Sequence, residues 1–211
     1  MFEIEYKGGN TVVISTKKSK LITDPRQSVL GLKDQSVKDA VSLATESRLQ
    51  SVDPDARLAI EGPGEYEVVD FSIQGAAATR HIDTEDVEKK ATVYRIEIGD
   101  ARIALVGNIA PKLDESQLES LGVVDVLIIP VGGGGYTLDA TAASAMTRSI
   151  DPKVVIPIHY SDSSLSYEVP QDDLSVFVAE LGVSVETTSK YKIKSLANLP
   201  PTLTIVELTR S

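Results

Sequence analysis

Imidazole is the side chain most often used for metal binding and for acid–base chemistry near neutral pH, and this chain has only two histidines, His81 and His159. Asp24 stands before a proline at the end of a predicted strand, and Asn108 follows another predicted strand end. Asp139 precedes a predicted helix. Sites of open α/β sheets lie beyond the carboxyl ends of strands, so these residues are candidates for a site. Each alone also suits an ordinary role as a turn former, helix cap or hydrogen-bonded imidazole.

Residues 124–160 have the pattern of a strand, a glycine loop, a helix and a second strand that ends at His159. The apolar run 126–129 is too short for a membrane span, and its β-branched residues favour a buried strand. Four consecutive glycines, 132–135, permit a sharp turn or a close approach of the backbone to a ligand. With the second strand at 154–158, the pattern predicts a βαβ unit that positions one imidazole.

The other predicted elements surround this unit. Strands are expected at 2–6, 11–16, 20–23, 38–44, 58–60, 65–78 (one long strand or a hairpin), 91–98, 101–106, 184–193 and 202–208. Helices are expected at 114–121, after Thr137 or Asp139 as the alternative caps, and at 174–181, and a charged exposed loop at 83–90. The first three strands predict an antiparallel meander. We expect one domain, 1–211.

The composition limits the classes of function. A hydrophobic fraction of 42% and a charged fraction of 25% are ordinary for a soluble globular protein, and the net charge of −10 argues against nucleic acid as a partner. No cysteine is present, which removes disulfides, thiolate nucleophiles and cysteine-bound zinc. There is also no G-x-S-x-G nucleophile motif. Without an apolar stretch of about 18 residues, we expect a cytoplasmic protein with no membrane partner.

Four stretches together resemble a known family: LITDP at 21–25, GPGEYE at 62–67, PVGGGGYTLDA at 130–140 and KVVIPIHY at 153–160. The chain resembles the metallo-β-lactamase fold, and within it the branch of small metal-dependent hydrolases that includes ascorbate-6-phosphate lactonase. The resemblance covers nearly the whole chain. It implies an α/β protein with mixed sheets, arranged as a four-layered αββα sandwich with the site along one edge.

The same resemblance implies that most metal ligands are missing. The family's first metal motif, His-x-His-x-Asp-His, corresponds to residues 45–50, which read Thr-Glu-Ser-Arg-Leu-Gln. Thr45 and Ser47 stand for two histidines, Leu49 for the aspartate and Gln50 for the last histidine. Zinc prefers imidazole, thiolate or carboxylate, and none of these four side chains supplies one.

Outside that motif, the bridging aspartate of the family corresponds to Asn108, and only His81 and His159 match metal-binding histidines. In the family's dinuclear site, these two would serve different metals. The metals lower the pKa of a bridging water to make hydroxide, and the motif aspartate orients it. With Leu49 at the aspartate position, both functions are expected to be absent.

The leading hypothesis is therefore a metallo-β-lactamase-fold protein that has lost its metal centre and acts as a binding or structural protein, with no cofactor. Its cleft or residual site is expected to contain Asp24, Thr45, Ser47, Gln50, His81, Asn108, Asp139 and His159. The rival is a hydrolase of a small ester, lactone or phosphorylated sugar that uses zinc or another divalent metal at a mononuclear site. That site would draw on Asp24, Glu46, His81, Asp139 and His159. A third possibility is a subunit that assembles with a catalytically intact relative. The partner, a small molecule or a protein, and the oligomeric state are left open.

Overall fold

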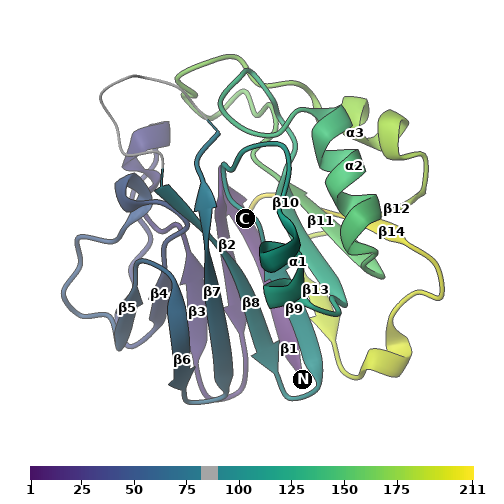
Figure 1. Cartoon of the computed structure of the whole chain (residues 1–211). Helices are drawn as coiled ribbons and strands as arrows, with labels where there is room; N and C mark the ends of the chain where they lie inside the picture. Colours follow the sequence, from purple (N-terminus) through teal and green to yellow (C-terminus); the bar gives the residue numbers. More distant parts are fainter. Residues whose placement is uncertain (82–89) are drawn as a thin grey trace.

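Two β-sheets lie face to face in the computed structural model, which describes residues 1–81 and 90–211 (Figure 1). The expected exposed loop at 83–90 therefore lies outside the described residues, apart from Lys90, which begins a strand. Within the described part of the chain, no helix is long and apolar enough to cross a membrane.

The first sheet has six strands in the order β13-β1-β2-β3-β4-β5. Its strands are β1 (Phe2–Gly8), β2 (Thr11–Ser15), β3 (Lys20–Thr23), β4 (Val41–Leu43), β5 (Leu58–Ile60) and β13 (Tyr191–Ile193). The expected meander is confirmed, since β1, β2 and β3 pair antiparallel, whereas β3, β4 and β5 run parallel.

The second sheet has eight strands in the order β12-β14-β11-β10-β9-β8-β7-β6. Its strands are β6 (Gly64–Val68), β7 (Phe71–Thr79), β8 (Lys90–Ile98), β9 (Ala101–Leu105), β10 (Val126–Pro130), β11 (Val154–Ile158), β12 (Ser184–Thr188) and β14 (Thr204–Leu208). The β10 and β11 strands pair in parallel, which confirms the predicted βαβ unit. Both are buried throughout, as their continuous apolar sequences require.

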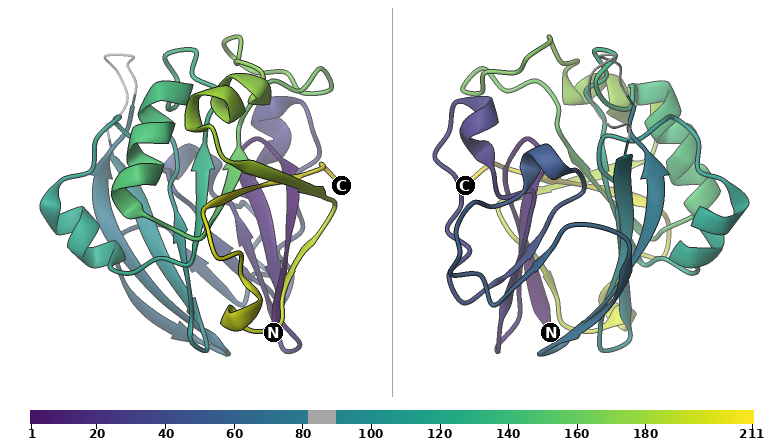
Figure 2. Two further views of the ribbon diagram at one scale, coloured as in Figure 1. Left: turned by 90° about the vertical axis from the view of Figure 1, so that its right-hand side faces the viewer. Right: turned by 60° about the vertical axis from the view of Figure 1, so that its left-hand side comes forward.

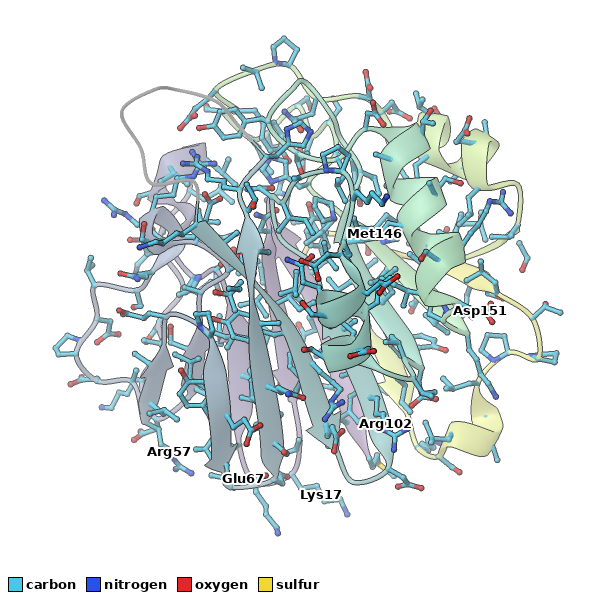
Figure 3. The ribbon with its side chains drawn as sticks, in the orientation of Figure 1. Lys17, Arg57, Glu67, Arg102, Met146 and Asp151 are labelled. Carbon is cyan, nitrogen blue, oxygen red and sulfur yellow. The ribbon has the colours of Figure 1, made fainter. Side chains whose placement is uncertain are left out.

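Three α-helices cover the outer face of the second sheet (Figure 2): α1 (Glu115–Leu121), α2 (Ala140–Ile150) and α3 (Leu174–Leu181). Asp139 is the cap of α2, because its side chain accepts a hydrogen bond from the Ala142 amide at 2.7 Å, and this decides between the two predicted caps. Asp151, in left-handed conformation, ends the helix. Figure 3 labels Met146, whose buried side chain belongs to the apolar cluster under α2.

The main core lies between the two sheets. In β1 the side chains alternate, so that Phe2, Ile4 and Tyr6 are buried against the opposite sheet. The outer face of the first sheet is covered by the 3-10 helix η1 (Gln27–Leu30) and by chain segments that bury Val37 and Ala40. The metallo-β-lactamase-type sandwich is confirmed, with this layer built from coil and 3-10 turns.

Two predicted strand boundaries are wrong. Residues 184–193 do not form one strand, because the chain turns after Thr188 and β12 and β13 join different sheets. The predicted strand at 38–44 is confined to β4, and Lys38 forms only an isolated bridge with Ala56.

Candidate functional site

The site lies where several strands of both sheets end. Asp24 follows β3, Glu46 follows β4, Asn108 follows β9 and His159 follows β11. The loops at this edge are at the top of Figure 1. The opposite end of the sandwich carries Lys17 in the turn after β2, Glu67 near the end of β6 and Arg102 near the start of β9 (Figure 3). The carboxyl ends of these strands therefore bring together residues that are far apart in the sequence.

Asp24 is buried in a left-handed backbone conformation, with φ 43°. Both of its carboxyl oxygens are engaged by Thr45: Oδ1 accepts from the Thr45 amide and Oδ2 from the Thr45 hydroxyl, each at 2.7 Å. Burial raises the pKa of Asp24 to about 8 despite these hydrogen bonds. The carboxyl is thus a structural group that faces Thr45.

Glu46 is the centre of a buried charge network. Its Oε2 lies 2.7 Å from Nε of Arg80 and 3.2 Å from Nε of Arg48. The other oxygen, Oε1, accepts a hydrogen bond from Nδ2 of Asn108 at 2.7 Å. The Glu46 and Arg80 side chains are only 3% and 8% exposed, so this ion pair is largely removed from water. Two guanidinium groups therefore neutralise one buried carboxylate.

Arg48 also connects the network to the loops above it. Its guanidinium lies 4.5 Å from the centre of the Tyr136 ring and donates a hydrogen bond to the Tyr136 hydroxyl. At the surface, its Nη1 is 3.1 Å from Oε1 of Glu168. The positive charge of Arg48 acts on both Asp24 and His159. It lowers the pKa of His159 and offsets part of the increase that burial causes in the pKa of Asp24. One guanidinium thus supplies the positive charge close to these two side chains.

His159 has a left-handed backbone, with φ 51°, and its amide donates to the Gly9 carbonyl at 2.9 Å. Its Nδ1 lies 2.8 Å from Oδ1 of Asn10, and its ring centre is 5.0 Å from that of Tyr167. Burial, with a smaller effect from the charge of Arg48, lowers the pKa of His159 to about 3. The imidazole is therefore neutral near neutral pH.

A hollow opens between these groups. The space that the centre of a water molecule can occupy is about 20 Å³, which is room for about one water molecule, and the space between the atoms is about 430 Å³ when open solvent is included. It is lined by Asn10, Thr11, Asp24, Arg26, Val29, Leu30, Arg48, Leu49, Asn108, Tyr136, His159, Tyr167, Glu168, Val169 and Gln171. The buried polar residues among them, Asn10, Thr11, Asp24, Asn108 and His159, are called its floor; the apolar lining consists of the buried Leu30 and Leu49 and the half-buried Val29 and Val169.

The predicted cleft residues divide between places. Asp24, Asn108 and His159 line the hollow. Thr45 and Ser47 border a second hollow beside Glu61, so the expectation that they face the first one is corrected. Local contacts hold Thr45 in this position. Its hydroxyl donates to Asp24, and Gly107 packs so closely against it that an added Cβ would lie only 2.5 Å from the hydroxyl oxygen.

The remaining three predicted residues line neither of these two hollows. Gln50 leaves the 3-10 helix η2 (Ser47–Leu49) as its C-cap, and Asp139 is exposed at the cap of α2. His81 is half-buried, and its amide donates to the Asn108 carbonyl at 2.9 Å. The imidazole nitrogen Nδ1 of His81 has no hydrogen-bond partner among the described residues.

The donor set does not fit the metal ions that the fold family implies. Asp24 directs both oxygens to Thr45, and Glu46 faces two arginines and an asparagine amide. Over residues 1–81 and 90–211, no three His, Cys, Asp or Glu side chains are placed to share a metal ion. Guanidinium and amide nitrogens that donate hydrogen bonds cannot act as metal ligands.

Sequence reasoning missed four residues of the site: Asn10, Arg48, Arg80 and Tyr136. Arg48 occupies a variable position of the family motif, and Asn10 lies between the predicted strands 2–6 and 11–16. Their contacts join residues far apart in the chain, such as Asn10 and His159, which are 149 positions apart. A search for arginines beside the lost ligands would have found Arg48.

The sandwich and the edge site define a metallo-β-lactamase-fold protein. The chain belongs to the β-lactamase superfamily domain family, whose model matches residues 3–159. This confirms the resemblance inferred from the sequence motifs.

Relatives and solved structures agree with this assignment. The chain is 33% identical over 67 residues to a metal-dependent hydrolase of Salinibacter ruber, and 35% identical over 60 residues to one of Natranaerobius thermophilus. These matches cover 32% and 28% of this chain but only 29% and 25% of the relatives.

A candidate zinc-dependent hydrolase of the metallo-β-lactamase superfamily from Thermotoga maritima superposes with a TM-score of 0.77 at 21% identity, covering 99% of this chain and 100% of that one. A metallo-hydrolase from the archaeon Ignicoccus hospitalis gives a TM-score of 0.69 at 16% identity, covering 92% and 99%. At these identities the structures establish the fold alone.

Proposed function

We propose that this protein is a metal-independent binding protein on the metallo-β-lactamase fold, without hydrolase activity. The observation that carries the proposal is the network around Glu46. At the edge where the family holds cations, this carboxylate already has two guanidinium partners and an amide donor. A buried charge that is paired and hydrogen-bonded needs no further cation.

The residues of the hollow also support binding without hydrolysis. Hydrolysis by this fold requires an activated water, and Leu49 lines the hollow at the position where the family has the orienting aspartate. Nδ1 of the neutral His159 imidazole lies 2.8 Å from Oδ1 of Asn10, which suits a ring that positions the Asn10 amide. The rival mononuclear hydrolase has no support among the described residues, because its five carboxylate and imidazole groups do not converge.

Metal content and thermal stability test the proposal together. We expect protein purified without chelator or affinity metal to contain zinc, iron and manganese each well below one atom per chain. We also expect the same melting temperature with and without EDTA, because a core of this size does not depend on a metal for folding. Stoichiometric metal that EDTA removes, with a fall of several degrees in the melting temperature, would contradict the proposal and favour the hydrolase hypothesis.

A further inference from the structure

We propose that the hollow binds a small uncharged molecule through an amide-like group that both accepts and donates hydrogen bonds. The inference rests on the proposed function, because it gives a ligand class to a protein that binds rather than hydrolyses. It depends on two buried side-chain amides, the balance of charge around them and the shape of the hollow.

Two buried side-chain amides of the floor leave one donor and one acceptor unpaired, and Oε1 of Gln171, which also lines the hollow, is a second unpaired acceptor. Nδ2 of Asn10 and Oδ1 of Asn108 are buried and have no hydrogen-bond partner among the described residues. Both residues line the hollow, and the side chains are 4% and 2% exposed. Leaving a buried polar group unpaired is costly, so each atom requires a partner that enters from the hollow.

Neighbouring groups decide which end of each amide is free. Nδ2 of Asn108 donates to the carboxylate of Glu46. A carboxylate only accepts hydrogen bonds and the amide oxygen cannot donate one, so Oδ1 of Asn108 is the free end. Oδ1 of Asn10 lies 2.8 Å from Nδ1 of His159, and in the tautomer that carries its proton on Nδ1 the ring donates to this oxygen, which leaves Nδ2 of Asn10 free. The ligand group must therefore offer an acceptor to Asn10 and a donor to Asn108. A carboxylate lacks the donor and an ammonium lacks the acceptor.

The charges beside the floor cancel. Arg48 and Arg80 carry two positive charges, and Glu46 and Glu168 carry two negative ones, all joined in one series of contacts. A charged ligand would have to leave water without an opposite charge to meet it. Arg26, which also lines the hollow, and Glu168 are both exposed, so water screens both of these charges. The two amides thus lie beside charges of both signs, and an uncharged polar group needs no opposite charge among them.

The apolar lining of the hollow indicates that the ligand also has an apolar part. The lining is divided between the polar floor and the apolar side chains of Val29, Leu30, Leu49 and Val169, and the space has room for a group about the size of a water molecule. A small polar head with an aromatic or aliphatic body fits this division, since pockets commonly combine apolar walls with a few placed polar groups. Benzamide is a probe with these features.

Titration of ¹⁵N-labelled protein with three matched probes tests the ligand class. Benzamide, benzoate and benzylamine share a ring and differ in charge. We expect benzamide to shift the side-chain amide signals of Asn10 and Asn108, with a dissociation constant at least about tenfold lower than those of the other two, because they leave one floor amide unpaired. Equal or tighter binding of benzoate or benzylamine in the hollow would overturn the class and leave the binding function standing.

Replacing Asn108, which carries the free acceptor, tests whether benzamide binds in the hollow. Asn108→Leu should weaken benzamide binding about tenfold or more, and Asn198→Leu, the same change at an exposed residue of η3 (Leu196–Asn198), should not. Should Asn108→Leu fail to fold, intermolecular NOEs in the wild type decide. Contacts from the benzamide ring to the methyl groups of Leu49 and Val169 support the proposal, and contacts elsewhere contradict it.

The remaining outcomes separate the two proposals. If no probe shifts the amide signals of Asn10 and Asn108 and the protein still takes up no stoichiometric zinc, the proposed ligand class is wrong, but the proposed binding function stands. If no probe binds and zinc added to dialysed protein binds at one atom per chain or more, the binding function falls with it. Unchanged amide signals at saturating benzamide would show that the two floor amides are satisfied by water.

Discussion

Asn108 donates from Nδ2 to Oε1 of Glu46 over 2.7 Å, and both side chains are buried. The residue at the family's bridging-aspartate position is thus joined to a carboxylate. An aspartate there would place two carboxylates in hydrogen-bond contact without a proton or cation between them. The asparagine and the arginines of this network are therefore interdependent, and substitutions in it should show strong coupling.

The ion pair between Glu46 and Arg80 is the first test of that coupling. Arg80→Met should lower the free energy of unfolding by about 3 kcal/mol, because it removes one partner of a buried carboxylate. Adding Glu46→Gln to Arg80→Met should restore part of the loss, since the buried charge is then gone. Urea denaturation of both single variants and the double variant measures the coupling. Effects that add within about 0.5 kcal/mol would mean that the pair is not coupled.

Asp24 should make the protein less stable as the pH rises. Its folded pKa of about 8 exceeds the ordinary aspartate pKa of 3.8, so the folded state keeps a proton that the unfolded state loses. The contribution is complete below the unfolded pKa and is lost as the pH rises between these two values. Asp24→Asn, which suits the left-handed backbone, should be more stable than the wild type at the alkaline end, by an amount on the order of a few kcal/mol. Stability curves that stay parallel for the two proteins across this window would contradict the buried neutral carboxyl.

His159 should have the opposite effect. Its pKa falls from 6.5 to about 3 in the folded protein, so the unfolded state binds the proton first. This contribution is present above the unfolded pKa and is lost as the pH falls through the window toward 3. His159→Asn should therefore flatten the acid side of the stability curve. NMR titration of the wild-type imidazole provides a direct check, and protonation at its ordinary pKa would disprove the burial argument.

Gly107 should not tolerate a methyl group, although its φ is not in the left-handed region. An added Cβ would lie 2.5 Å from Oγ1 and 2.6 Å from Cβ of Thr45, whose side chain is held by Asp24. We expect Gly107→Ala to cost about 1–3 kcal/mol of stability through overpacking. Gly62→Ala is the matched control, because a Cβ there has nothing within 4 Å. Similar thermal melts for both variants would show that the loop can move away.

The strands and the βαβ unit were predictable because their patterns are local. Residues 154–158 and 174–181 were predicted with their observed bounds, since the apolar run and the terminal glycine mark them without reference to the rest of the chain. The division between β12 and β13 was not predictable. Both halves of 184–193 favour strand, and only the positions of their partners in the two sheets separate them.

The site was predictable only in part, for a related reason. The strand-end rule found Asp24, Asn108 and His159, because it depends on the sequence next to each residue. The partner of Arg48, Tyr136, lies 88 positions away, and no local pattern links the two. The residue types of 45–50 can be compared with a family motif from sequence alone, but the partners of Glu46 and Arg48 are identified only by their contacts in space.

The pairing of β13 with β1 has a consequence for synthesis of the chain. The β1 strand leaves the ribosome well before β13 and keeps one edge unpaired until residues 191–193 have been made, after every other strand of its sheet. An unpaired strand edge is a template for aggregation, and chains are made at about 5–20 residues per second. A nascent chain of this protein therefore carries an open β1 edge for many seconds, and ribosome-associated chaperones should be most needed in that interval.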